Sequence, residues 1–455
     1  MNLTERKRSR GALSIDRSST IIFAAACVFL FFVFRYLFLM QSAHGEITEP
    51  FYSDLMAYVP PNTPEGFRAI SDIFKALYGI TGNAVLIPWF MAAAAVLCIV
   101  SVRLLIGYLL RRSGGMVGAG FGLGNGAGAE FGVGGGVKAG AGAEFGVGDG
   151  AGGVYANPGG AALLSALSVF VSPILIPKLY HYYYAATWPS FAWHSPTYIL
   201  LAASSALAFL FFLKLYDRCF DPAAHGKPIL FLAFAAALFV SSWSKPSFFM
   251  VFAPVAFAVM LVRLLRPRDG FPLSKRFAAV LPFALAVVPS VCYFVYIYFL
   301  SFGEESTNHV VVSFGFLYNL TGNPVFKPLL GLAFPIAVLV FNAKKQRGNI
   351  AYLMAWAMAA LGFLIAFTFI EDGDRLYHGN FGWGVTLSSF LLFAVSMSVY
   401  LAELRPAAPT GNAPAKPLTR IAKARLSLTG LILAAHIVIG IRYFVYLLSG
   451  GYYNI

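Results

Sequence analysis

The residues best suited to chemistry lie in one short stretch between two long apolar runs. It reads Glu-Asp-Gly-Asp-Arg-Leu-Tyr-His-Gly-Asn-Phe-Gly-Trp, from Glu371 to Trp383. Charged side chains near a bilayer cost several kcal/mol unless they are paired, hydrated or face a cavity, so this stretch is a hypothesis for a functional site. The alternative is a solvated loop whose acids face lipid headgroups. The polar side chains at issue are Glu371, Asp372, Asp374, Arg375, His378 and Asn380.

A second candidate is an acid among apolar and aromatic neighbours, Asp54 in Glu-Pro-Phe-Tyr-Ser-Asp-Leu-Met-Ala-Tyr. Partial burial raises the pKa of a carboxyl group and suits it to act as a general base. The alternative is structural, because Ser53 or Asp54 can start a short interfacial helix as its N-cap.

The segment 178–196 is dense in tyrosine and tryptophan. Such a segment is typical of the aromatic belt at a membrane interface. It also suits a platform for a sugar or an isoprenoid, because aromatic faces stack on a pyranose while histidine and tyrosine reach its hydroxyls. The candidates for this role are His181, Trp188, Trp193 and His194.

A basic residue, Lys245, lies in the turn Ser-Ser-Trp-Ser-Lys-Pro-Ser that separates two apolar runs. Pro246 ends the helix there, and the compact lysine charge suits a lipid-linked phosphate. Snorkelling of the side chain to the headgroups is the alternative.

The composition determines the class of protein that must position these groups. The chain has 455 residues, of which 59% are hydrophobic and 11% charged, whereas soluble domains carry about 25% charged residues. We therefore predict an all-α, polytopic integral membrane bundle of about eleven spans, each needing about 20 apolar residues. The runs near 229–242 and 329–341 are short and suit half-helices or tilt partners. The expected spans are Thr20 to Met40, Ala84 to Leu110, Ala161 to Pro177, Thr197 to Leu215, Ile229 to Ser242, Ser247 to Leu265, Phe277 to Leu300, Leu329 to Phe341, Ala351 to Ile370, Val385 to Leu401 and Ser427 to Leu448.

The basic residues predict the topology. Most of the 33 Lys and Arg fall on one side when the chain is threaded through these spans, so the N-terminus is expected in the cytoplasm. The net charge of +14 then reflects loops against anionic lipid and gives no reason to invoke nucleic acid. The expected regions are a cytoplasmic basic tail at 1–19, two spans at 20–110 with an external loop at 41–83, a Gly/Ala-rich cytoplasmic linker at 113–160, a bundle at 161–449 with external loops at 178–196, 301–328 and 371–383, and an external tail at 450–455.

Two further patterns are weak. The linker contains a GxGxxG match beginning at Gly148, but no strand precedes it, so it carries little weight for a nucleotide site. The four cysteines form no CxxC pair, which implies neither a disulfide framework nor a zinc site.

All the polar clusters therefore fall on the external side. This arrangement resembles the GT-C superfamily of membrane glycosyltransferases, through the acid in the first external loop and the aromatic, histidine and basic residues of later loops. Locally, the patches Trp-His-Ser-Pro-Thr-Tyr at 193–198, Lys-Pro-Ser-Phe at 245–248 and His-Gly-Asn-Phe-Gly-Trp at 378–383 look like those of uncharacterised bacterial multi-pass proteins of similar organisation. Ser195 stands where that pattern has asparagine.

The resemblance implies a role for each candidate. Asp54 would be the general base, and Lys245 and Arg375 would neutralise the departing lipid phosphate. Histidines and aromatic residues would position sugar and acceptor. The acids at 371–374 would orient Arg375 or hold a divalent ion, because hard carboxylates suit magnesium or manganese. The expected partners are a polyprenyl-phosphate-linked sugar, membrane lipids and a glycan, lipid or protein acceptor at the cell envelope, with the protein in the plasma membrane.

Two other classes stay open. A transporter or flippase would place ionisable residues at mid-span, and here the spans are almost clean apart from Arg35 and Arg442. A polysaccharide polymerase acting on lipid-linked glycans would use several external arginines, and the expected external loops offer Arg68 and Arg375.

Overall fold

The computed structural model describes residues 3–43, 54–60, 68–116, 158–174, 191–220, 227–266, 271–303, 309–314, 326–372, 380–404 and 418–451. Within these residues the chain forms thirteen α-helices, three short 3-10 helices and one two-stranded sheet. The all-α class is thus confirmed, with a small β ribbon added to it.

The first half of the chain, up to residue 265, contributes seven α-helices and two of the 3-10 helices. These elements are α1 (Leu3–Ala43), η1 (Asp54–Tyr58), α2 (Arg68–Thr81), α3 (Ile87–Met116), α4 (Pro158–Leu167), η2 (Ser168–Phe170), α5 (Pro196–Arg218), α6 (Lys227–Ser244) and α7 (Ser247–Leu265).

The second half contributes the remaining helices and both strands. These elements are α8 (Leu273–Phe302), β1 (Val310–Val312), α10 (Phe326–Gly331), α11 (Ala333–Gln346), α12 (Ile350–Thr368), β2 (Phe369–Glu371), η4 (Asn380–Gly382), α13 (Trp383–Glu403) and α14 (Arg420–Leu448).

Eight of the described helices are long and apolar enough to cross a membrane, which makes the chain an integral multi-pass membrane protein. Among the described residues, eight of the about eleven predicted spans therefore meet this criterion of length and composition. The other three apolar runs are helical but shorter: α4 with η2, α6, and α11. With 14 residues, α11 rises only about 21 Å, less than the bilayer core of about 30 Å.

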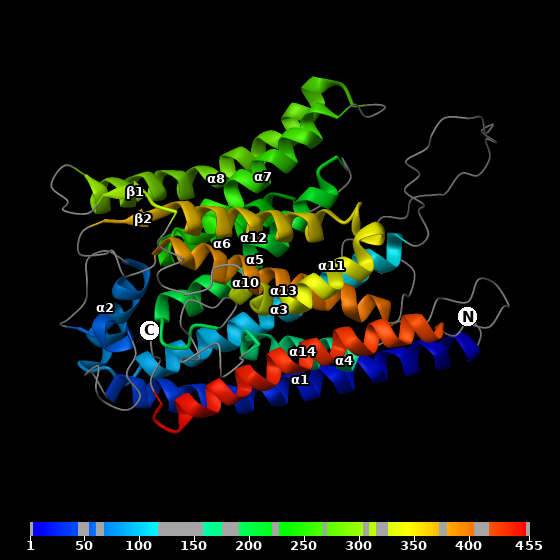
Figure 1. Ribbon diagram of the computed structural model, residues 1–455, viewed down its shortest axis with the longest axis horizontal. Helices are drawn as coiled ribbons and strands as arrows, with labels where there is room; N and C mark the ends of the chain where they lie inside the picture. The colour runs from blue at the N-terminus through cyan, green and yellow to red at the C-terminus, as the bar shows by residue number, and fades with distance from the viewer. Residues whose placement is uncertain are drawn as a thin grey trace.

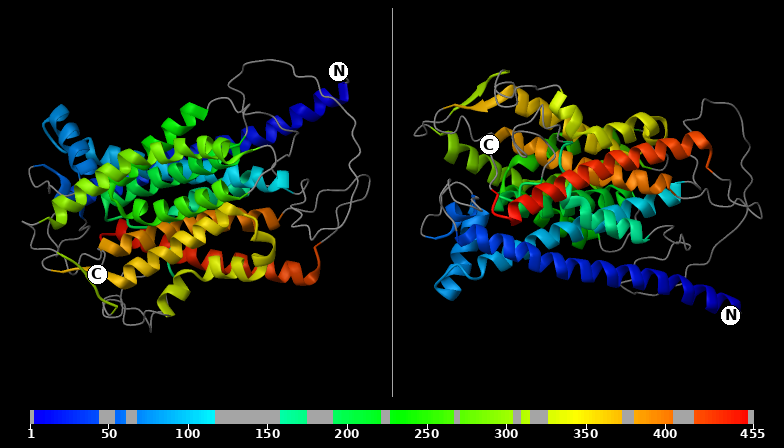
Figure 2. Two further views of the ribbon diagram at one scale, coloured as in Figure 1. Left: turned by 90° about the horizontal axis from the view of Figure 1, so that it is seen from above. Right: turned by 60° about the horizontal axis from the view of Figure 1, so that its bottom comes forward.

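The long helices lie side by side along the longest axis of the molecule (Figure 1). The two turned views show the same bundle, with the N-terminus of α1 projecting at one end (Figure 2). At the opposite end lie α2, which stands across the helices, and the ribbon of β1 and β2 (Figure 1). We call this second end the ribbon end of the bundle.

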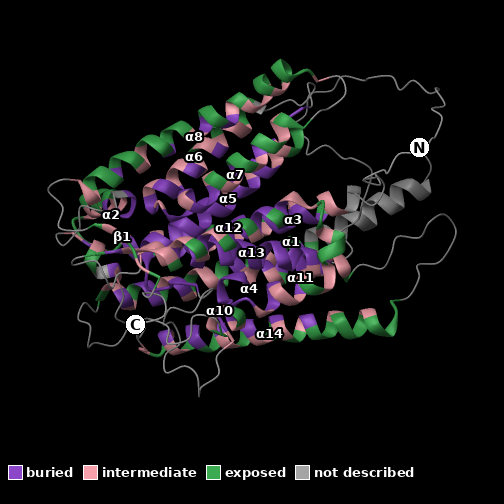
Figure 3. Ribbon diagram, turned by 45° about the horizontal axis from the view of Figure 1, so that its top comes forward, coloured by how far each residue is buried: buried purple, intermediate pink, exposed green. Residues whose placement is uncertain are grey.

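Burial separates central helices from peripheral ones (Figure 3). The apolar windows of α13 and α5 are 89% and 83% buried, whereas that of α8 is 11% buried. Therefore α5 and α13 form the centre, and α8 presents most of its surface to lipid. Gly362 allows α12 to approach α13 closely, because a Cβ added there would lie 3.2 Å from the backbone of Gly384.

A histidine in the middle of α14, His436, is fully buried. Its Nδ1 lies 2.6 Å from the carbonyl oxygen of Ser172, and its Nε2 accepts a hydrogen bond of 3.4 Å from the Phe334 backbone N–H. Because a carbonyl only accepts, the proton sits on Nδ1 and both ring nitrogens are engaged. His436 is thus a further ionisable residue within a span, beside the expected Arg35 and Arg442, and it ties α14 to two other segments.

Candidate functional site

Four segments far apart in the sequence bring polar side chains together at the ribbon end. The backbone N–H of Asp54 donates to the carbonyl oxygen of His194 at 3.1 Å. The charge of Lys245 interacts with those of Asp54 and Glu371, and His194 lies within electrostatic reach of Asp54 and Lys245. We call these four residues, Asp54, His194, Lys245 and Glu371, the polar cluster.

Lys245 is placed by the break between α6 and α7. Its backbone N–H donates to the Ser241 carbonyl at 3.0 Å, which closes the last turn of α6, and Pro246 precedes the first residue of α7. The side chain is only 6% exposed, and its Nζ lies 3.9 Å from the centroid of the Trp383 ring. The turn is therefore as predicted, but the lysine is buried in the protein and does not snorkel to the headgroups.

Burial of Lys245 lowers its pKa to about 7, because the charged form loses hydration. The carboxylates of Asp54 and Glu371 act in the opposite direction and favour the charged form. As a result of these opposing effects, Lys245 changes between its charged and neutral forms near pH 7.

His194 precedes α5 and is 3% exposed. Burial and the neighbouring Lys245 lower its pKa to about 4, while Asp54 opposes the shift. The imidazole is therefore neutral at pH 7, and it can donate one hydrogen bond and accept another.

Glu371 is positioned by the β ribbon, an element that the sequence did not predict. It pairs in register with Val310, and the next residue, Asp372, donates its N–H to the His309 carbonyl at 2.8 Å. The Glu371 side chain is 7% exposed, and its Oε2 accepts a hydrogen bond of 2.6 Å from Nδ2 of Asn380. Two predicted site residues are thus in direct contact, while Asp372 is exposed.

Asp54 is the first residue of the 3-10 helix η1, so it does begin a short helix. One turn later, Tyr58 lies near its carboxylate and shares a hydrogen bond with the side chain of Thr197. Burial raises the pKa of Tyr58, and the Asp54 charge raises it further. The site also includes Tyr58, Thr197 and Trp383. The sequence did not predict this, although these residues lie in the patterns around Asp54, His194 and His378.

Trp193 is 1% exposed and packs in an aromatic group. Its ring lies 4.6 to 5.9 Å from those of Phe34, Phe170, Phe191 and Phe444. This packing anchors the segment that carries His194. The predicted contact of Trp193 with substrate stays a prediction.

Five predicted site residues, His181, Trp188, Asp374, Arg375 and His378, lie outside the described residues. Among the residues that are described, no group of three or more His, Cys, Asp and Glu is placed to hold a metal ion. The divalent ion considered for the acids at 371–374 stays a prediction.

The polar cluster combines groups that can hold and move a proton with one that can oppose negative charge. Asp54 and Glu371 are acceptors when ionised, and neutral His194 can donate and accept. Lys245 supplies three donors and a positive charge in a site shielded from water, where electrostatic interactions are strong.

The fold and the cluster define an integral multi-pass helical membrane protein with a buried polar site of mixed charge at one end of its bundle. Comparison of the chain with protein-family models, with curated proteins and with solved structures finds no match.

Proposed function

We propose that the protein is a membrane glycosyltransferase of GT-C type, which moves a sugar from a polyprenyl-phosphate carrier to a glycan, lipid or protein acceptor of the cell envelope. The observation that carries this proposal is the convergence of a carboxylate, Asp54, and a buried cation, Lys245, in one cluster at an end of the bundle. Displacement of a phosphate by a hydroxyl needs a base and an opposing positive charge.

In the proposed reaction an acceptor hydroxyl attacks the anomeric carbon of the sugar. The new bond joins the acceptor oxygen to that carbon, and the bond from carbon to phosphate oxygen breaks. The polyprenyl phosphate leaves with the electron pair, and the hydroxyl proton passes to Asp54. A single displacement of this kind inverts the anomeric centre.

The other groups of the cluster would hold the charges in place. Protonated Lys245 opposes the charge that develops on the leaving phosphate, and Arg375 is the second cation proposed for this role. The charge of Glu371 favours the protonated form of Lys245, and Asn380 fixes the Glu371 carboxylate through its 2.6 Å hydrogen bond. Neutral His194 and the aromatic residues would orient sugar and acceptor.

The proposed topology places the N-terminus in the cytoplasm, with the ribbon end and the C-terminus outside the plasma membrane. It is supported by the basic N-terminal segment and by the basic residues between spans. The polar cluster would then face the side on which lipid-linked sugars are used for envelope assembly.

The described residues give little support to the alternative functions, a transporter or flippase and a polysaccharide polymerase. A transporter would have ionisable groups free to bind or relay at mid-span. The buried His436 lies there, but both of its ring nitrogens are engaged by backbone groups.

The test is transfer of radiolabelled sugar from polyprenyl-phosphate donors in membranes that contain the protein. Asp54→Asn removes the proposed base and is expected to lower transfer by about 100-fold or more. Asp72→Asn is the matched control, because Asp72 is an exposed acid on α2. Arg375→Ala tests whether the second proposed cation contributes.

Label that moves in the unmutated protein and in Asp72→Asn, but not in Asp54→Asn, supports the transferase and its base. Transfer that survives Asp54→Asn assigns the base to another acid, with Glu371 tested next. Intact protein that transfers from no donor contradicts the proposal and favours a role in moving or polymerising lipid-linked glycans.

A further inference from the structure

A second group of charged side chains lies at the other end of α3 and α5 from the polar cluster. α5 starts two residues after His194 and ends at Arg218, so its far end is about 30 Å away along the helix. Four cations and one carboxylate gather there. We call this group, Tyr108, Arg111, Arg112, Lys214, Asp217 and Arg218, the basic cluster.

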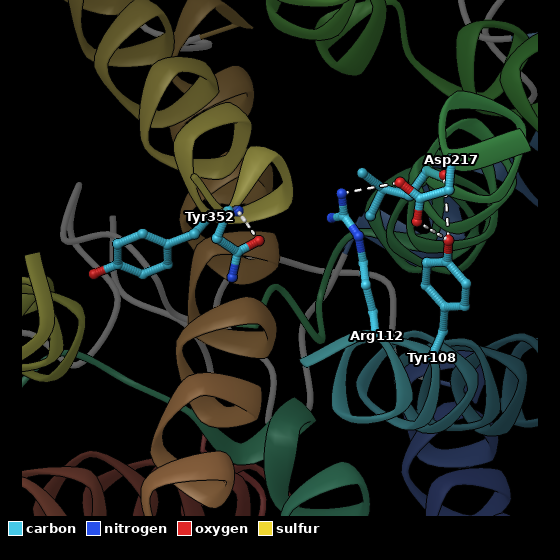
Figure 4. A network of polar contacts seen from close by, with 6 residues as sticks. Tyr108, Arg112, Asp217 and Tyr352 are labelled. Atoms are coloured by element: carbon cyan, nitrogen blue, oxygen red, sulfur yellow. Dashed lines mark hydrogen bonds and ion pairs between the residues drawn. The ribbon is translucent and has the colours of Figure 1, made fainter. Parts of the chain in front are cut away.

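The carboxylate of Asp217 holds the basic cluster together (Figure 4). Its Oδ2 accepts a hydrogen bond of 2.5 Å from the Tyr108 hydroxyl, and its Oδ1 lies 2.9 Å from Nη2 of Arg112. Both oxygens of the only acid in the cluster are therefore engaged by α3.

Arg112 keeps an unused donor. Its Nη1 is buried and has no hydrogen-bond partner among the described residues. A guanidinium group presents several N–H donors in a fixed fork, and one left unsatisfied in a buried position is costly. The unused donor therefore indicates that an acceptor from outside the described chain completes this site.

The remaining three cations give the basic cluster an excess of positive over negative groups. Lys214 is half-buried, with its Nζ 5.9 Å from the centroids of the Tyr108 and Phe211 rings. Arg111 and Arg218 are exposed, and both lie within electrostatic reach of Lys214. Side chains of one sign repel each other, so an anion bound between them stabilises the group.

We propose that the basic cluster binds the phosphate headgroup of an anionic phospholipid. The cluster lies where two candidate spans end, at Ser113 and Arg218, which is the level of lipid headgroups. Arginine and lysine near that level attract anionic lipid, and arginine binds phosphate in a bidentate manner. The aromatic rings beside Lys214 offer an apolar flank to the acyl chains.

The test is lipid binding by the full-length protein in a neutral detergent, measured by native mass spectrometry and by the thermal unfolding midpoint. Phosphatidylglycerol is compared with phosphatidylcholine and with soluble glycerol phosphate. The variant Lys214→Gln/Arg218→Gln removes two cations of the cluster. Its matched control, Arg420→Gln/Lys423→Gln, removes two exposed cations at the start of α14.

We expect phosphatidylglycerol to bind the unmutated protein more tightly than phosphatidylcholine does, and the cluster variant to weaken it by about tenfold or more. The control should change affinity by less than about twofold. The single variant Arg218→Gln, at an exposed position, keeps the test valid if the double variant does not fold, and it should lose about threefold or more.

Equal losses in the cluster variant and its control would overturn the proposal in favour of a diffuse basic surface. Equal binding of the two lipids would overturn it as well. Glycerol phosphate that binds as well as the lipid would show a site for free phosphate in place of a lipid headgroup.

Discussion

The Nζ atom of Lys245 lies 3.9 Å from the centroid of the Trp383 ring, so the cation in the turn between α6 and α7 contacts the first residue of α13. A cation over a tryptophan face is attracted by the ring quadrupole, by about 2 kcal/mol when the pair is shielded from water. The contact therefore links two spans and also keeps the lysine charge inside the polar cluster.

The first prediction concerns this contact. In a double-mutant cycle, Lys245→Met and Trp383→Leu should show a coupling of about 1–2 kcal/mol in the free energy of unfolding in detergent. The control cycle pairs Lys245→Met with Trp356→Leu, because Trp356 packs on Tyr352 within α12. A coupling near zero for the first pair would show that the ring only fills space.

The second prediction is a pH dependence of sugar transfer, and it rests on the proposed function. Lys245 has a pKa lowered to about 7, so it carries its charge below that pH and loses it above. The kcat/KM for transfer should fall as the pH rises through about 7, since kcat/KM reports the free enzyme. Lys245→Arg keeps the charge at all these pH values, so it should remove this fall. A profile that is identical in the arginine variant would contradict the role given to Lys245.

The third prediction concerns stability in acid. His194 has a pKa of about 4 in the folded protein against an ordinary value of 6.5, so the unfolded chain binds the proton more tightly. Its contribution to stability is complete above about pH 6.5 and is lost as the pH falls through about 4, by at most about 3 kcal/mol. His194→Gln should flatten the stability curve between these values, whereas His309→Gln, at an exposed position, should not.

The fourth prediction concerns the pair formed by Glu371 and Asn380. Asn380→Ala removes the donor of the 2.6 Å hydrogen bond to a carboxylate that is 7% exposed. The loss should cost about 1–3 kcal/mol of unfolding free energy. The comparison is Lys345→Ala, which breaks an exposed 2.6 Å pair with Glu403 and should cost about 1 kcal/mol or less. Similar losses for the two variants would mean that burial does not strengthen the first pair.

Much of this arrangement can be predicted from the sequence because it depends on local physics. Apolar runs specify membrane helices, and a proline after Lys245 specifies a break between two of them. Polar residues are rare beside such runs, so the sequence alone marks the four members of the polar cluster as candidates for a site: Asp54, His194, Lys245 and Glu371. The convergence of all four depends on which helices pack together, and no local pattern encodes that packing.

Three features could not be predicted for identifiable reasons. The β ribbon that holds Glu371 has only three residues in each strand, too few for an alternating pattern. The lengths of the helices near 161–177 and 329–341 could not be predicted either, because apolar composition continues beyond the ends of α4 and α11. His436 was missed because one histidine in an apolar run gives no sign that backbone groups of two other segments satisfy it.

The last prediction concerns Gly440, where α14 passes the 3-10 helix η2. A Cβ added at this position would lie 1.5 Å from the carbonyl oxygen of Phe170, and a backbone atom cannot move aside as a flexible side chain can. Gly440→Ala should therefore push α14 away from η2 and lower the unfolding free energy by about 3 kcal/mol or more. Gly79→Ala is the matched control, since nothing lies within 4 Å of the added carbon on the exposed face of α2. Alanine is the better helix former there, so this control should be neutral or stabilising by up to about 1 kcal/mol. Thermal unfolding of both variants in one detergent measures the contrast, and a Gly440→Ala protein as stable as the control would mean that α14 and η2 are not in contact.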